Sequence, residues 1–101
     1  MPIVGDLRAW DAQCRIDPVT IAVEAEMRLS DLQALDRRIA LKCRDSGIEI
    51  VILLVAATHA NRRHLKEHRE ALRASFPLDT REVLAAIRVG QSPGASGIVL
   101  L

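Results

Sequence analysis

The spacing of apolar residues along the chain changes near residue 30. Residues 19–28 alternate between two faces, with Glu24 and Glu26 on the same face, and this alternation predicts a β-strand. After residue 30 the apolar spacing becomes three and four, which predicts an amphipathic helix over residues 31–46. The run at residues 48–57 is apolar and rich in β-branched side chains, so it predicts a central strand parallel to the first.

Capping residues mark the ends of the predicted helices. Ser30 and Gln33 fit the capping box that would begin the helix at 31–46, and Gly47 fits the left-handed residue that would end it. Asp79 and Glu82 fit a second capping box, which predicts a short helix at 80–89 that Gly90 closes.

The other expected elements are shorter. They are a strand at 3–4, a turn at 5–6, a strand at 7–14, a turn at 17–18, a helix at 60–74 capped by Thr58 or Asn61, and a last strand at 98–101. The strand, helix and strand between residues 19 and 57 form a right-handed βαβ unit. The sequence therefore predicts an α/β fold, a small mixed sheet with flanking helices, as one domain over residues 1–101.

Composition narrows the class of protein. The chain has 101 residues, which suits a single domain, and 14 Lys and Arg balance 13 Asp and Glu. A non-specific binder of nucleic acid or membranes is usually more basic. The longest apolar run, residues 50–57, is too short to span a membrane. The two cysteines are widely spaced, so we expect free thiols in a cytoplasmic protein without a zinc knuckle.

Three carboxylates form the best candidate for chemistry. If the strand at 7–14 forms a hairpin with the strand at 19–28, Asp11 lies beside Glu24 and Glu26. Carboxylate oxygens are the ligands that Mg²⁺ or Mn²⁺ prefers, and such a site can activate water against a phosphodiester. The plain alternative is an acidic pair on a solvated sheet face.

A second motif is weaker. His64 and His68 frame an H-x-x-E-H pattern, which matches an inverted zinc-protease motif on a helix. The segment is crowded with charged residues, as expected for the solvated face of a helix, and this reading is favoured.

Four segments are familiar in combination: GDLRAWDA at 5–12, residues 23–56, NRRHL at 61–65 and GIVLL at 97–101. Together they resemble the second half of bacterial proteins that carry an N-terminal helix-turn-helix segment. That half is similar to the restriction-endonuclease-like, PD-(D/E)xK fold. The resemblance implies a core of hairpin, acidic strand, helix, central strand and further helices.

The resemblance also implies roles for individual residues. Asp11 and Glu24 match the two acids of the motif, and Glu26 stands where lysine is usual. Gln33 and Arg37 match the helix that borders the active site in many such nucleases, which makes them accessory candidates.

This sequence departs from the family pattern. The motif lysine is absent, and the only lysines are Lys42 and Lys66. Met27 stands where relatives carry threonine, and Ala57-Thr58 stands where they carry an Asp-Thr pair. The helix-turn-helix half and the leading helix are missing, which leaves a fragment, a shortened gene product and a free-standing descendant as open alternatives.

Three functions follow as hypotheses. The missing lysine and the neutral charge favour a DNA-associated regulatory or interaction module with a degenerate or weak active site, which meets DNA through a fused or separate helix-turn-helix protein. The alternative is a Mg²⁺-dependent DNA phosphodiester hydrolase that uses Asp11, Glu24 and Glu26. A third is an oligomerisation domain, because the strand at 98–101 would leave a sheet edge that needs a partner, such as another copy of the chain.

Overall fold

The computed structural model describes residues 10–101 as a four-stranded sheet with three helices. The elements are β1 (Ala12–Ile16), β2 (Val19–Glu26), α1 (Leu32–Ser46), β3 (Ile50–Val55), α2 (His59–Leu72), α3 (Thr80–Arg88) and β4 (Gly97–Leu100). The strands lie in the order β1-β2-β3-β4, with β1 antiparallel to β2 and the other pairs parallel. This arrangement confirms the predicted α/β class and the small mixed sheet.

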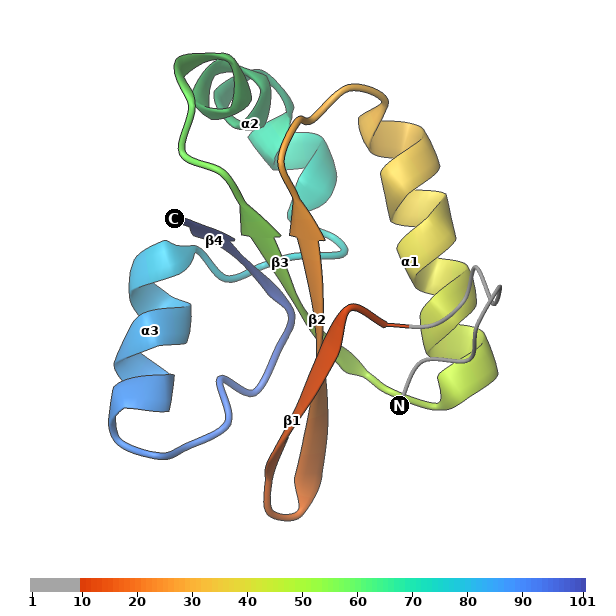
Figure 1. The fold of residues 1–101 in the computed structure, drawn as a ribbon, viewed down its shortest axis with the longest axis vertical. Coiled ribbons are helices and arrows are strands. Elements are labelled where there is room, and N and C mark those ends of the chain that lie inside the picture. The colour runs from red at the N-terminus through yellow and green to blue at the C-terminus, as the bar shows by residue number, and fades with distance from the viewer. Residues whose placement is uncertain (1–9) are drawn as a thin grey trace.

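Helices cover both faces of the sheet, and Figure 1 shows α1 and α3 on opposite sides of it. Parallel strands are usually covered in this way, which explains the continuous apolar run of β3. The core under α1 and α2 includes Ala22, Val51, Leu53, Leu35, Ile39, Leu65 and Phe76. The core under α3 includes Ile21, Ile50, Ile52, Val83 and Val99.

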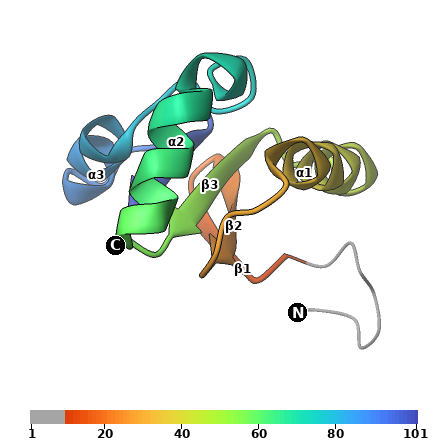
Figure 2. The ribbon, with the colours of Figure 1, turned by 90° about the horizontal axis from the view of Figure 1, so that it is seen from above.

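Seen from above, α1 and α3 lie on opposite sides of the strands, and α2 runs in a different direction from both (Figure 2). β1 and β2 form a hairpin through the turn at 17–18, as expected, with Cys14 opposite Ile21. No helix among residues 10–101 combines the length and apolar character that a membrane crossing needs.

Several predicted boundaries were wrong by a few residues. Of the strand expected at 7–14, residues 7–9 lie outside the described residues, and the described part of the strand, β1, runs from Ala12 to Ile16. β2 ends at Glu26, two residues early. β3 is shorter than 48–57, α2 begins at His59 and ends at Leu72, and β4 begins at Gly97. The strand expected at 3–4 and the turn at 5–6 lie outside the described residues. The strand expected at 48–57 was too long because Ile48, Ala56 and Ala57 are apolar although they lie in the connections.

The cap of α1 was assigned to the wrong residue. Asp31, not Ser30, is the N-cap, and its side chain accepts a hydrogen bond from the Ala34 backbone N–H. Aspartate is as good an N-cap as serine, and the chain turns into the helix one residue later than the Ser30–Gln33 box requires. Gly47 ends the helix with φ of 75°, as predicted.

The caps of the other helices agree with the sequence. Thr58 caps α2 through its side chain. Asp79 and Glu82 form the complete capping box of α3, with hydrogen bonds of 3.2 and 3.3 Å. These caps could be predicted from the sequence because a cap depends on residues three positions apart and not on the rest of the fold.

Asn61 fastens the loop after the acidic strand to the start of α2. Its side-chain oxygen accepts from the Leu29 N–H, and its amide nitrogen donates to the carbonyls of Met27 and Ala56, each at 2.9 Å. Asn61 is 1% exposed. Asn61 therefore satisfies three buried backbone groups and holds the carboxyl ends of β2 and β3 together.

Candidate functional site

The hairpin brings Asp11 next to Glu24, a juxtaposition that the sequence left conditional on the hairpin. The Asp11 N–H donates to Glu24 Oε1 at 3.2 Å, and the Asp11 carboxylate accepts from the Ala25 N–H at 2.9 Å. Both contacts join a side chain of one strand segment to the backbone of the other. The Asp11 carboxylate thus extends the hydrogen bonding between the two segments to the residue before β1.

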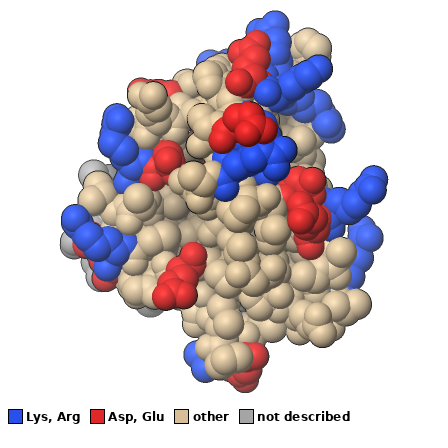
Figure 3. All heavy atoms as spheres, turned by 180° about the vertical axis from the view of Figure 1, so that it is seen from behind, with Lys and Arg blue, Asp and Glu red and all other residues tan. Residues whose placement is uncertain are grey.

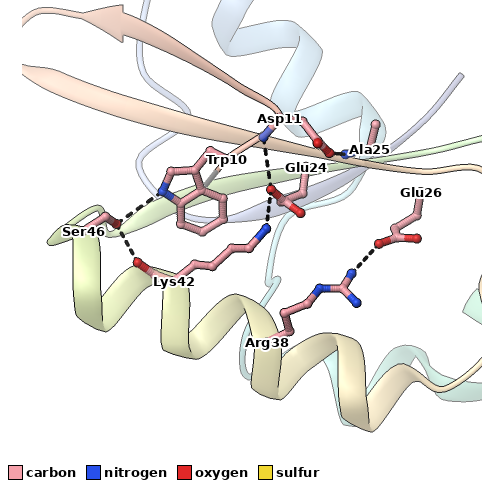
Figure 4. Close-up of polar contacts among 8 residues, drawn as sticks. All are labelled: Trp10, Asp11, Glu24, Ala25, Glu26, Arg38, Lys42 and Ser46. Atoms are coloured by element: carbon pink, nitrogen blue, oxygen red, sulfur yellow. Dashed lines mark hydrogen bonds and ion pairs between the residues drawn. The ribbon is translucent and has the colours of Figure 1, made fainter. Parts of the chain in front are cut away.

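Glu24 is buried and paired with Lys42 of α1 (Figure 4). Lys42 Nζ lies 3.0 Å from Glu24 Oε1, the same oxygen that accepts from Asp11. The side chains are only 7% and 4% exposed. A buried charge is tolerated when an opposite charge and hydrogen bonds compensate its lost hydration, and Glu24 has both.

Trp10 lies against this pair. Lys42 Nζ lies 5.4 Å from the centroid of the Trp10 ring, within the range of a cation–π contact. Trp10 is 5% exposed, and its indole N–H donates to Ser46 Oγ at 3.3 Å. Ser46 Oγ in turn donates to the Lys42 carbonyl at 2.7 Å. Trp10, Glu24, Lys42 and Ser46, here called the buried ion-pair cluster, therefore connect the hairpin to the last turns of α1.

Glu26 belongs to a separate pair. Its carboxylate contacts Arg38 of α1, and the side chains are 25% and 49% exposed. Glu26 lies two residues beyond Glu24 on the same sheet face, but each acid faces a different cation of α1. The three carboxylates proposed from the sequence are thus each engaged with a protein group.

The donor set does not fit a divalent metal ion. A shared Mg²⁺ or Mn²⁺ needs several carboxylate oxygens directed at one point, but the Lys42 ammonium holds the Glu24 oxygen and Arg38 holds Glu26. Among residues 10–101, no three acidic, histidine or cysteine side chains are grouped to hold a metal.

The two accessory candidates lie elsewhere on α1. Gln33 lies nine residues before Lys42, about 13 Å along the helix axis, and both Gln33 and Arg37 are exposed. Gln33 lines a pocket of about 600 Å³ between α1 and α2, together with Asp31, Asp36 and His68. Neither residue contacts the buried ion-pair cluster.

The histidines of the H-x-x-E-H pattern stack on α2. Their ring centroids are 5.9 Å apart, and His64 Nδ1 is a buried atom without a hydrogen-bond partner in the described part of the chain. His68 is exposed. Since no third ligand is grouped with them among residues 10–101, the pair lacks the ligand set of a zinc protease.

Lys42, Trp10 and Ser46 were not recognised as site residues from the sequence. Lys42 carried a signal, because it lies three residues after Ile39 and seven after Leu35, on the apolar stripe of α1. A lysine on a buried stripe requires a buried anion, and Glu24 is the only acidic residue of the chain buried among those described.

Comparisons with known proteins add no relative. No family model matches the chain, and neither the search of curated proteins nor the search of solved structures found a match.

Proposed function

We propose that this chain is a DNA-associated regulatory or interaction module of the cytoplasm, with a nuclease-like fold whose acidic residues hold the fold together. The observation that carries the proposal is the buried contact between Glu24 and Lys42. This contact supports a structural role for Glu24, the acid that a nuclease would use for metal. The association with DNA rests on the resemblance of the chain to helix-turn-helix proteins, and the fold by itself carries no function.

The surface of α2 is the best candidate for weak contact with a nucleic-acid backbone. Arg62, Arg63 and Lys66 are exposed on this helix. From behind, Lys and Arg side chains gather at the top of the molecule, where α2 lies, while the lower middle of this view is mostly uncharged (Figure 3). Glu67 and Glu70 lie on the same helix and reduce its field, so the affinity of this chain alone should be low.

The first experiment tests the acidic residues. Mn²⁺ is titrated into ¹⁵N-labelled protein while amide broadening is followed, and a supercoiled plasmid is incubated with protein and Mg²⁺ or Mn²⁺. We expect no broadening centred on residues 11, 24 and 26 below millimolar metal and no cleavage above background. Metal-dependent cleavage that Glu24→Gln abolishes would overturn the proposal in favour of the hydrolase.

The second experiment tests the DNA contact. Fluorescence anisotropy with a 20-base-pair duplex at 0.15 M salt should give a Kd of about 10–100 µM, in the range of non-specific binding. Arg62→Glu combined with Arg63→Glu should weaken binding and lower the salt slope by about 2, because each phosphate contact contributes about 0.9. The matched control is Arg81→Glu combined with Arg88→Glu on α3. Equal loss in both double variants, or no binding by the wild type, would refute the assignment to α2.

A further inference from the structure

The two edge strands of the sheet, β4 and β1, differ in whether their outer backbone groups have hydrogen-bond partners. On β4, the Leu100 N–H donates to Thr80 Oγ1 at 3.0 Å, and Thr80 Oγ1 donates to the Ile98 carbonyl at 3.3 Å. The Ile98 N–H donates to the Leu78 carbonyl at 3.1 Å. The edge formed by residues 97–100, where the sequence suggested a partner, is therefore closed by the start of α3.

β1 forms the other edge and remains open among the described residues. Within residues 10–101 it pairs only with β2, and no backbone group outside that ladder bonds to it. The strand has no Pro or Lys, two devices that commonly block edge pairing. An open edge of this kind is a template for another strand.

Charges alternate along one face of this edge in a self-complementary order. Side chains alternate between faces along a strand, so Gln13 and Arg15 lie on one face of β1 and Ala12 and Cys14 on the other. Asp11 directly precedes β1, and continued alternation places it on the face of Gln13 and Arg15. All five residues are exposed. From residue 11 to residue 15 the charges on this face run negative, neutral, positive. An antiparallel copy presents them in the reverse order, so each charge lies opposite one of opposite sign.

We propose that β1 pairs antiparallel with β1 of a second copy of this chain, about a two-fold axis at Gln13. In this register Asp11 faces the partner's Arg15 at both ends, and Gln13 faces the partner's Gln13. The small side chains Ala12 and Cys14 face each other across the pair. The two sheets then join into one sheet of eight strands with an isologous interface.

Charge selects this register over its neighbour. Pairing about Cys14 would place Asp11 opposite the partner's Asp17, and like charges directly opposite are destabilising. Arg15 contacts Asp17 within its own chain, but a guanidinium has five N–H donors and can serve both carboxylates. Asp11 lies just before β1 and keeps both of its bonds to β2, in which its N–H donates to Glu24 Oε1 and its carboxylate accepts from the Ala25 N–H. The pairing therefore uses only the Asp11 carboxylate, which can accept a further hydrogen bond from the partner's Arg15.

The interface is small, so the dimer is weak. One pair of five-residue strands buries less than the roughly 1,200 Å² of a stable complex, and we expect a Kd on the order of 100 µM. The inference stands independently of the proposed function, because strand pairing requires no DNA.

Sedimentation equilibrium over about 10 µM to 1 mM tests the association. The wild type should approach twice the 11.1 kDa chain mass at the highest concentration. Arg15→Glu turns both attractive contacts into repulsive ones and should weaken the dimer at least about tenfold. Arg88→Glu makes the same charge change on α3 and should leave the Kd unchanged. A monomer at 1 mM, or equal effects of the two variants, would overturn the proposal.

Disulfide trapping tests the register. Gln13→Cys in a Cys43→Ser background places two thiols directly opposite, with Cα atoms about 4.5–5.5 Å apart, within the range of a disulfide. The native Cys14 thiols would have Cα atoms about 8 Å apart, too far to bridge. In a glutathione redox buffer, the 13–13 disulfide should accumulate as a covalent dimer. Bridging through Cys14 in the Cys43→Ser parent would instead indicate the neighbouring register and refute the one proposed.

Discussion

Replacing Lys42 by methionine should destabilise the protein by about 3–5 kcal/mol, because it leaves the Glu24 carboxylate buried without its cation. The side chains of the pair are 7% and 4% exposed, so water cannot easily replace the lost contact. The cation–π contact with Trp10 is lost as well. For a domain of this size, 3 kcal/mol lowers Tm by at least about 12 °C.

Urea unfolding at pH 7, followed by circular dichroism, measures the effect as a change in midpoint at constant m-value. Arg38→Met is the matched control, because it breaks an ion pair that is 49% and 25% exposed, and its cost should stay below about 1 kcal/mol. The double variant Lys42→Met with Glu24→Gln should recover most of the loss, which isolates the interaction between the two charges.

Two results would refute this reasoning. A cost below about 1 kcal/mol for Lys42→Met would mean that the buried pair does not hold the hairpin to α1. A rise in stability on Glu24→Gln alone would mean that the carboxylate is repelled by its surroundings, as in a metal site without its metal. The first result would contradict the energetic argument, and the second would also contradict the proposed function.

Three further changes test other parts of the fold. Asn61→Ala should cost about 2–4 kcal/mol in urea unfolding, because it leaves three buried backbone groups unsatisfied. Gly97→Ala should cost about 1–3 kcal/mol in the same assay, since the new Cβ would lie 2.5 Å from Val83 Cγ2, and Val83→Ala should offset part of that loss. Burial raises the pKa of the Cys43 thiol, so less of it is the reactive thiolate at pH 8. Iodoacetamide should therefore modify the exposed Cys14 faster than Cys43, as measured by mass spectrometry, and equal rates of modification would contradict this prediction.

The sequence was sufficient where the signal is local. The stripe through Leu35 and Ile39 identified α1, and Asp79 with Glu82 identified the start of α3. The apolar run of β3 showed that this strand is inner and parallel to its neighbour. These features depend on residues within one or two turns of each other, or on a composition that only a covered strand has.

The partners of the two acids on β2 could not be predicted from the sequence in this way. Alternation placed Glu24 and Glu26 on one face, and this is correct, but it could not tell which cations of α1 would lie above each acid. That outcome depends on the angle at which α1 crosses the strand. Lys42 on the buried stripe was the one available clue, and it concerns a residue 18 positions away from Glu24.

The order of the strands in the sheet has a consequence for folding kinetics. Each strand pairs with the strand before it in the chain, so the sheet can grow by adding one neighbour at a time after the β1–β2 hairpin forms. No step requires a later strand to insert between two that are already paired. The entropy cost of closing each loop is therefore divided among successive steps, one for each added strand. We expect a folding rate between those of helical bundles and of all-β sandwiches, as for other mixed α/β domains. β4 adds last, and with it Ile98 and Val99 complete both layers of the core at once.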